Sequence, residues 1–380
     1  MDKHTYKQNA YYLIYLIRCV LNNKIPAKTK LDKMDLSGVF AVAKAHSLTA
    51  IAAYALESAG IYNKDFEDEK NRSIRKTIIL DSERERVFSE FEKAEIWYMP
   101  LKGIILKEYY PAIGMRQMAD NDFLIDKTRQ KDIKDIMLSC GFKVEQYDKS
   151  KHDVYFKEPI CNFQMHVSLF EEDSKDSLYC YFKDIDKDLI PDKGSKYGRH
   201  FSNEDYYLYI KAHEYKHYSS SGTGLRNLVD TYVLINRFGE TLDWEYLRSK
   251  LKKLGLLEYE KKSRNLAEKL FRGEKLNNDE KLFLDYYIFS GTYGTTENSV
   301  NNKVRKLGGN QSAKWKYALD RIFVPFRKNN PQYRAYKAQY PFFYEHKLLL
   351  PVLPFYRLFH SLYKSKSRIL TEIKTLLKLK

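Results

Sequence analysis

One stretch of the chain, LKGIILKEYYPAIGMRQMADNDFLI at 101–125, combines the residue types that phosphate and metal chemistry require. Its five candidate site residues are Lys102, Gly103, Arg116, Asp120 and Asp122. Glycine at the start of a helix lets an anion approach free backbone N–H groups, and a guanidinium can clamp phosphate oxygens. Carboxylates supply the hard oxygen ligands that Mg²⁺ or Mn²⁺ prefers. The stretch therefore predicts a site that holds a nucleoside triphosphate together with a divalent metal ion.

The two aspartates stand at the head of the apolar run FLI, which predicts a short strand. Side chains two apart on a strand point to the same face, so Asp120 and Asp122 could share a pair of metal ions about 4 Å apart. Lys102 and Gly103 would lie where a strand meets a helix, with Arg116 within reach of the same cleft. Because a D-x-D triplet alone is a weak motif, the aspartates could instead be polar turn residues before the strand.

The order strand–LKG–helix, then arginine, then D-x-D resembles the bacterial nucleotidyltransferase-like family of the DNA polymerase β superfamily. Further segments are similar to that family in the same order: AKAHSLTAIAAYAL, FQMHVSL, HEYKH with LRNLVDTYVLI, and YPFFYEHKLLLPVLPFYRL. The resemblance implies transfer of a nucleotidyl group from a nucleoside triphosphate to an acceptor hydroxyl. It also implies that Asp120 and Asp122 bind the metal, and that Lys102 and Gly103 form the turn at the triphosphate.

The chain departs from the superfamily pattern at two points. The turn usually contains Gly-Gly or Gly-Ser and lies closer to the acids. A third metal carboxylate on a later strand has no clear counterpart, because Gln164 and His166 stand there. His166 could be a neutral metal ligand, a base or substrate contact, or a histidine satisfied at the end of the sheet. A non-catalytic relative that binds a nucleotide or a partner protein is therefore the alternative to an enzyme.

A second motif, HEYKH at 213–217, fits the H-E-x-x-H pattern of zinc metalloproteases and places two histidines on one helix face. Ser220 and Thr223 stand where the extended motif requires glycine and histidine, which makes the protease the weaker interpretation. The predicted substrate contacts are Gln164, His217, Arg226 and Asp230. For His217, Arg226 and Asp230, a purely structural role is an equal alternative to substrate contact.

The composition indicates a globular protein of two or three domains, with 380 residues of which 43% are hydrophobic. A formal net charge of +16 favours polyanionic partners: nucleotides, an anionic membrane surface or, less favoured, nucleic acid. The four cysteines have no C-x-x-C spacing and are typical of reduced, buried residues in a cytosolic protein. Neither a secretory signal nor a membrane span is indicated, so we predict a cytoplasmic protein.

The apolar spacing predicts an α+β fold in which a small mixed sheet lies between helical regions. Helices are expected over 35–60 and 71–93, and a strand hairpin is expected around Glu158-Pro159. The predicted parts are a helical region at 1–93, a nucleotidyltransferase-like core at 94–189, a helical domain at 190–290, a loop or linker at 291–315, and a basic aromatic region at 316–380.

The last of these parts pairs aromatic residues with lysines. A basic amphipathic helix here could lie on an anionic membrane surface. The alternative is a helix packed on the body of the protein with its lysines in water.

Overall fold

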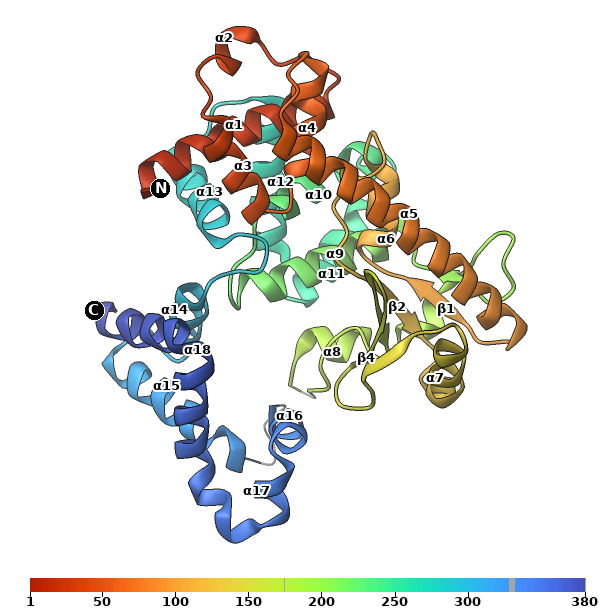
Figure 1. Cartoon of the computed structure of the whole chain (residues 1–380), viewed down its shortest axis with the longest axis vertical. Helices are drawn as coiled ribbons and strands as arrows, with labels where there is room; N and C mark the ends of the chain where they lie inside the picture. The colour runs from red at the N-terminus through yellow and green to blue at the C-terminus, as the bar shows by residue number, and fades with distance from the viewer. Residues whose placement is uncertain (174, 328–331, 380) are drawn as a thin grey trace.

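The computed structural model describes residues 1–173, 175–327 and 332–379. Helices surround one five-stranded mixed sheet, and a group of C-terminal helices extends from this body as an arm (Figure 1). The predicted α+β class is therefore confirmed. No helix of the described residues is both long enough and apolar enough to cross a bilayer.

The sheet forms because short, strongly apolar segments alternate with turns between residues 98 and 166. Its strands are β1 (Tyr98–Pro100), β2 (Asn121–Ile125), β3 (Lys143–Gln146), β4 (His152–Lys157) and β5 (Cys161–His166). They lie in the order β1-β2-β5-β4-β3, with β2 and β5 parallel and the other neighbours antiparallel. The β4–β5 pair is the hairpin predicted around Glu158-Pro159.

Both faces of the sheet are covered, so β2 is buried along its whole length. Phe123 packs with α5 (Lys64–Lys93) and α7 (Gln130–Ser139), whereas Leu124 belongs to the opposite core with α9 (Asn203–Tyr218) and α11 (Trp244–Lys253). Successive side chains on a strand alternate between faces. Asp122 therefore shares the α9 face with Leu124, which sets the direction in which the acidic site opens.

The N-terminal helices pack on helices that come much later in the sequence. These early helices are α1 (Lys3–Leu21), α2 (Lys28–Leu31), α3 (Leu36–Ala45) and α4 (Thr49–Ser58). They share one hydrophobic core with α10 (Leu225–Phe238), α12 (Leu257–Arg272) and α13 (Asn278–Ser290). Helices α9 to α12 lie within residues 190–290, where a helical domain is predicted.

The expectation of one helix over 35–60 is wrong, because the chain breaks between α3 and α4. Ser47 has φ +53, and the buried His46 Nε2 lies 3.1 Å from the carbonyl of Ile288. The backbone N–H of Leu225 also donates to His46 Nδ1 at 3.1 Å. A buried polar ring needs partners of this kind, and here they come from α13 and α10. The break follows from tertiary contacts that the local apolar spacing does not show.

The expectation of a loop or linker at 291–315 is also wrong. Helix α14 (Thr296–Lys306) occupies its middle, and α15 (Gln311–Phe323) begins before its end. The Thr295 side chain caps α14 by accepting from the N–H of Asn298, and Val300 and Val304 are buried in a small core. Capping and two valines are sufficient for a short helix in a segment whose composition is typical of loops.

The remaining helices are α8 (Ser177–Phe182), α16 (Gln332–Gln339), α17 (Pro341–Glu345) and α18 (Leu353–Lys378). A two-stranded sheet joins β6 (Ile190–Pro191) to β7 (Arg199–His200). The C-terminal part of α18 packs on α14 and α15, where Leu376 contacts their small core. Most of the rest of α18 faces solvent.

Candidate functional site

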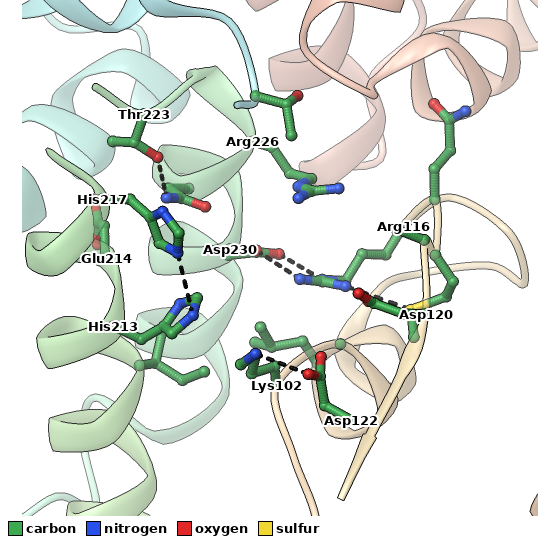
Figure 2. A pocket seen from close by; sticks show the side chains of 18 of the residues that line it. Lys102, Arg116, Asp120, Asp122, His213, Glu214, His217, Thr223, Arg226 and Asp230 are labelled. Atoms are coloured by element: carbon green, nitrogen blue, oxygen red, sulfur yellow. Dashed lines mark hydrogen bonds and ion pairs between the residues drawn. The ribbon is translucent and has the colours of Figure 1, made fainter. Parts of the chain in front are cut away.

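A cavity of about 310 Å³ lies between the start of β2 and the helices α9 and α10 (Figure 2). It brings together eight of the ten predicted site residues, although they are spread over more than a hundred positions of the chain. These are Lys102, Gly103, Arg116, Asp120, Asp122, His217, Arg226 and Asp230. The other two, Gln164 and His166, lie behind the aspartates on the neighbouring strand β5.

Strand pairing places Lys102 beside Asp122. The backbone N–H of Leu101 donates to the carbonyl of Asp122 at 2.9 Å, which ties the end of β1 to β2. Lys102 follows directly, and its Nζ lies 2.9 Å from Asp122 Oδ1 (Figure 2). Lysine and aspartate are both largely buried, so this ion pair is weakly screened. The lysine predicted to hold phosphate is thus directed at the metal-ligand candidate.

His166 supports the same carboxylate from the other side. Its Nε2 lies 2.7 Å from Asp122 Oδ1, and burial lowers the pKa of His166 to about 3, so the neutral ring donates this hydrogen bond. Burial works to raise the pKa of Asp122, but Lys102 and His166 outweigh it and hold that pKa well below its usual range. His166 is 1% exposed, and its Nδ1 is buried without a hydrogen-bond partner, so only one of its two ring nitrogens is satisfied and the three predicted alternatives stay open.

Asp120 has a different environment, although it is only two positions away. Its Oδ2 accepts a hydrogen bond of 2.9 Å from Gln164 Nε2. Burial and the nearby charge of Asp122 raise the pKa of Asp120 above its usual range. The site therefore contains one firmly ionised carboxylate and one that ionises less readily. That contrast is expected when two acids share a cavity.

Arg116 and Asp230 form a buried bidentate ion pair across the cavity. Arg116 Nε and Nη2 lie 2.9 and 3.0 Å from the two carboxylate oxygens of Asp230, and Tyr110 donates to Oδ1 at 2.6 Å. Gly103 makes room for this guanidinium, because a Cβ there would lie 2.3 Å from Arg116 Nη1. Asp230 thus has a structural partner in Arg116 while it also lines the cavity, and its predicted substrate contact stays a prediction. Arg116 Nη1 donates to the sulfur of Met118 at 3.4 Å.

Arg226 is the cavity's unpaired guanidinium. Its side chain points into the cavity (Figure 2), and it forms no hydrogen bond or ion pair with any residue that the structure describes. Its Nε is buried without a partner. Burial and the charge of Arg116 lower the pKa of Arg226, and together they outweigh the nearby Asp230 carboxylate, which works in the opposite direction.

The H-E-x-x-H motif does not form a zinc site in this structure. His213 and His217 approach each other, with 3.3 Å between their Nε2 atoms. Glu214 turns the other way, to Lys211 Nζ at 2.8 Å and the Tyr287 hydroxyl at 3.1 Å. Among residues 1–173, 175–327 and 332–379, no group of three or more His, Cys, Asp or Glu side chains could hold a metal.

Residues that the sequence analysis missed complete the site. Tyr206 donates to the carbonyl of Lys102 at 2.9 Å and so fixes the backbone from which the lysine projects. Thr292 and Tyr293, within the segment expected to be a linker, line the cavity. Tyr293 is 78% exposed there. No spacing rule connects these residues to the 101–125 stretch, because only tertiary packing brings them near.

The small mixed sheet, with paired aspartates where a central strand begins, defines the class of a nucleotidyltransferase-like protein. Residues 32–272 match a family described as uncharacterised nucleotidyltransferase, and the chain belongs to that family. The matched range contains every cavity residue except Thr292 and Tyr293. Neither a curated protein nor a solved structure matches the chain. The resemblance at LKG, arginine and D-x-D is thereby confirmed at the level of the family.

Proposed function

We propose that the protein transfers a nucleotidyl group from a nucleoside triphosphate to an acceptor hydroxyl with the help of Mg²⁺ or Mn²⁺. The observation that carries this proposal is the convergence of Asp120, Asp122, Lys102 and the unpaired Arg226 on one cavity. Two carboxylates and two cationic groups that line one cavity match the needs of a triphosphate with its metal.

The free oxygens of the two aspartates fit a divalent cation. Asp120 Oδ1 and Asp122 Oδ2 have no hydrogen-bond donor in the described parts of the chain, whereas the other oxygen of each is occupied. Mg²⁺ commonly takes one or two protein carboxylates and completes its shell with phosphate oxygens and water. The bound cation would offset the negative charge that develops on the transferring phosphoryl group.

Arg226 is the principal phosphate ligand in this proposal, since its guanidinium forms no hydrogen bond or ion pair with the residues that the structure describes and its Nε is buried without a partner. In the reaction, the acceptor oxygen bonds to the α-phosphorus and the bond from that phosphorus to the bridging β-oxygen breaks. Pyrophosphate leaves with the electron pair, and the acceptor proton passes to water. The chain's own contribution is to hold the triphosphate so that acceptor and leaving group are in line.

Tyr293 is placed to contact the nucleobase. Its ring is 78% exposed at the cavity wall, and a base that stacks on an aromatic ring gains about 1–3 kcal/mol. Stacking is tolerant of base identity, so this contact supports nucleotide binding without selecting one base.

Titration calorimetry with Mg-ATP tests the binding part of the proposal. Replacement of Arg226 by Met should weaken binding about 10- to 100-fold, since hydrogen bonds to charged groups contribute about 1.5–3 kcal/mol. Arg237→Met is the matched control, because Arg237 is exposed on the same helix and does not line the cavity. Equal binding by the Arg226 and Arg237 variants would contradict the assignment.

A search for released pyrophosphate separates the enzyme from its alternative. Pyrophosphate that appears with one member of a broad acceptor panel supports nucleotidyl transfer. Mg-ATP binding without pyrophosphate across the panel favours a non-catalytic nucleotide-binding relative. That alternative is motivated by the missing third carboxylate, where Gln164 and His166 stand.

We further propose that the C-terminal region contacts an anionic membrane surface. Residues 316–380 contain 14 Lys and Arg but 3 Asp and Glu, a net charge of +11. On α18, Phe355, Phe359 and Tyr363 are 65%, 69% and 91% exposed. Their spacing of four positions places them along one helix face. Exposed aromatic rings beside many cations fit a helix that lies at a lipid interface.

Vesicle flotation tests this surface contact. The protein should float with phosphatidylglycerol vesicles and remain in solution with phosphatidylcholine vesicles, and the Phe355→Ser/Phe359→Ser variant should lose the difference. Leu282→Ser is the matched control, because Leu282 is 68% exposed on α13 outside this region. Absence of binding to either vesicle contradicts the proposal. The proposal is also contradicted if light scattering shows a homodimer that dissociates only in the double variant, because the exposed rings would then contact a second copy of the chain.

A further inference from the structure

We infer that this site holds a single divalent cation, and that the Lys102 ammonium supplies the second positive charge beside Asp122. The inference rests on the proposed function and makes it more specific. It replaces the expectation that the two aspartates share a pair of metal ions. Three features of the described residues support it. Hydrogen-bond donors already occupy one oxygen of each aspartate, β5 supplies no third acid, and neighbouring contacts hold Lys102 in place.

The carboxylate oxygens that a second metal would need are already occupied. Asp122 Oδ1 accepts from Lys102 Nζ at 2.9 Å and from His166 Nε2 at 2.7 Å. Asp120 Oδ2 accepts from Gln164 Nε2 at 2.9 Å. A carboxylate oxygen with two short hydrogen bonds has little lone-pair capacity left for a cation. One oxygen of each aspartate remains open, which suffices for one metal ion.

No further acid is available to hold a second ion. The parallel register pairs Asp122 with Gln164, and two positions further along it pairs Leu124 with His166. Within the part of the chain that the structure describes, no third acidic, His or Cys ligand joins the two aspartates. Both residues of β5 that could have supplied a ligand donate hydrogen bonds to the aspartates instead.

The contacts around Lys102 fix its backbone and its side chain in one conformation. Its backbone has φ 47 and ψ −114, a conformation that residues other than glycine rarely adopt. The Tyr206 hydroxyl holds its carbonyl at 2.9 Å, and its side chain is only 18% exposed. An unfavourable backbone conformation persists where neighbouring contacts determine it. These contacts direct the ammonium at Asp122.

The Lys102 ammonium can take over part of the role that a second metal ion would have. It carries three N–H donors, and the contact with Asp122 uses one of them. The other two can donate to oxygens of the triphosphate, so Lys102 would join the substrate to the acidic pair. The predicted phosphate contact of Lys102 and its observed contact with Asp122 are therefore compatible.

Manganese binding tests the inference with a readout other than turnover. With a non-hydrolysable ATP analogue, electron paramagnetic resonance of free Mn²⁺ should count one bound ion per chain. Two bound ions would overturn the inference and leave the proposed function standing. Failure to bind both Mn²⁺ and the analogue would remove the proposed function, and the inference with it.

Substitution of Lys102 tests the role of its charge. Lys102→Met should tighten binding of Mn²⁺ alone at least about tenfold, because a cation no longer repels the metal from Asp122. Lys102→Arg should retain the wild-type affinity. Lys107→Met is the control, since Lys107 forms a comparable pair with Asp81 outside the cavity and its loss should change nothing. Unchanged or weaker Mn²⁺ binding in folded Lys102→Met would overturn the inference.

Discussion

The cavity and the C-terminal region are both rich in cationic groups, but they use them in opposite ways. In the cavity, Lys102 pairs with Asp122 and Arg116 pairs with Asp230, so the local charges nearly cancel. Residues 316–380 instead carry +11 of the chain's net +16, mostly on exposed surface. Most of the net positive charge of the chain therefore lies in the C-terminal region. The evidence for nucleotide binding comes from the arrangement of a few buried groups.

The comparison also separates two kinds of polyanion recognition. The cavity is contained almost entirely in the range that matches the nucleotidyltransferase family, whereas α14 to α18 lie beyond residue 272. Buried, paired groups select a ligand by geometry, whereas exposed cations attract any negatively charged surface and are sensitive to salt. Changes in the cavity should therefore have large and specific effects, and changes in the C-terminal region small ones on folding and catalysis.

The largest expected effect is on turnover in Asp122→Asn. Loss of this charge removes a metal ligand and the partner of Lys102, so pyrophosphate release should fall by about 10²- to 10³-fold or more. Circular dichroism should show an unchanged helix content, because asparagine can still accept from His166 and Lys102. Wild-type turnover in a folded variant would refute the assignment of Asp122.

The next largest effect is on stability in Arg116→Met. Removal of one member of a buried ion pair leaves Asp230 uncompensated and should lower the free energy of unfolding by about 3–5 kcal/mol. Urea denaturation measures this change. Arg72→Met, which removes an exposed pair with Glu69, should change it by no more than about 1 kcal/mol. Similar losses of unfolding free energy in both variants would contradict the claim that the buried Arg116–Asp230 pair stabilises the fold more than an exposed pair does.

Acidification should lower the free energy of unfolding of the protein, because the buried His46 resists protonation in the folded state. Burial lowers the pKa of His46 to about 4, below the unfolded value of about 6.5. The folded state therefore binds fewer protons, and stability is lost as pH falls through that interval. His46 alone should account for about 2 kcal/mol between about pH 7 and pH 5. His46→Gln should show a shallower loss in urea denaturation over that range; an equal loss would exclude His46 as the cause.

The smallest effect is expected on folding of the C-terminal double variant Phe355→Ser/Phe359→Ser. Both rings are mostly exposed, so each substitution should change the free energy of unfolding by no more than about 0.5 kcal/mol. Turnover with a soluble acceptor should be unchanged. A loss of several kcal/mol would show that these side chains pack on the protein, and the contrast between the two regions would fail.

The local elements near the cavity were predictable because their signals are local. Apolar runs separated by turns predict β2, the β4–β5 hairpin and the helical region at 190–290 that contains α9 to α12. The order of Lys102, Gly103 and the two aspartates indicates which strand ends line the cavity. Such features depend on spacing of a few residues, which the sequence displays directly.

The partners of these residues were not predictable, because they lie far away in sequence. Arg116 and Asp230 are 114 positions apart, and nothing in the spacing indicates that they bind each other. The end of α3 at His46 depends on partners from α13 and α10. Helix α14 depends on burial of two valines in a polar segment. In each case a tertiary contact overrides the local composition.

The most direct measurement is a crystal structure of the protein with Mn²⁺ and a non-hydrolysable nucleoside triphosphate analogue. We predict an anomalous signal from manganese between Asp120 and Asp122, with the phosphates on Arg226 and Lys102. Manganese and nucleotide bound elsewhere, with the two aspartates contacting only Lys102, His166 and Gln164, would contradict the account.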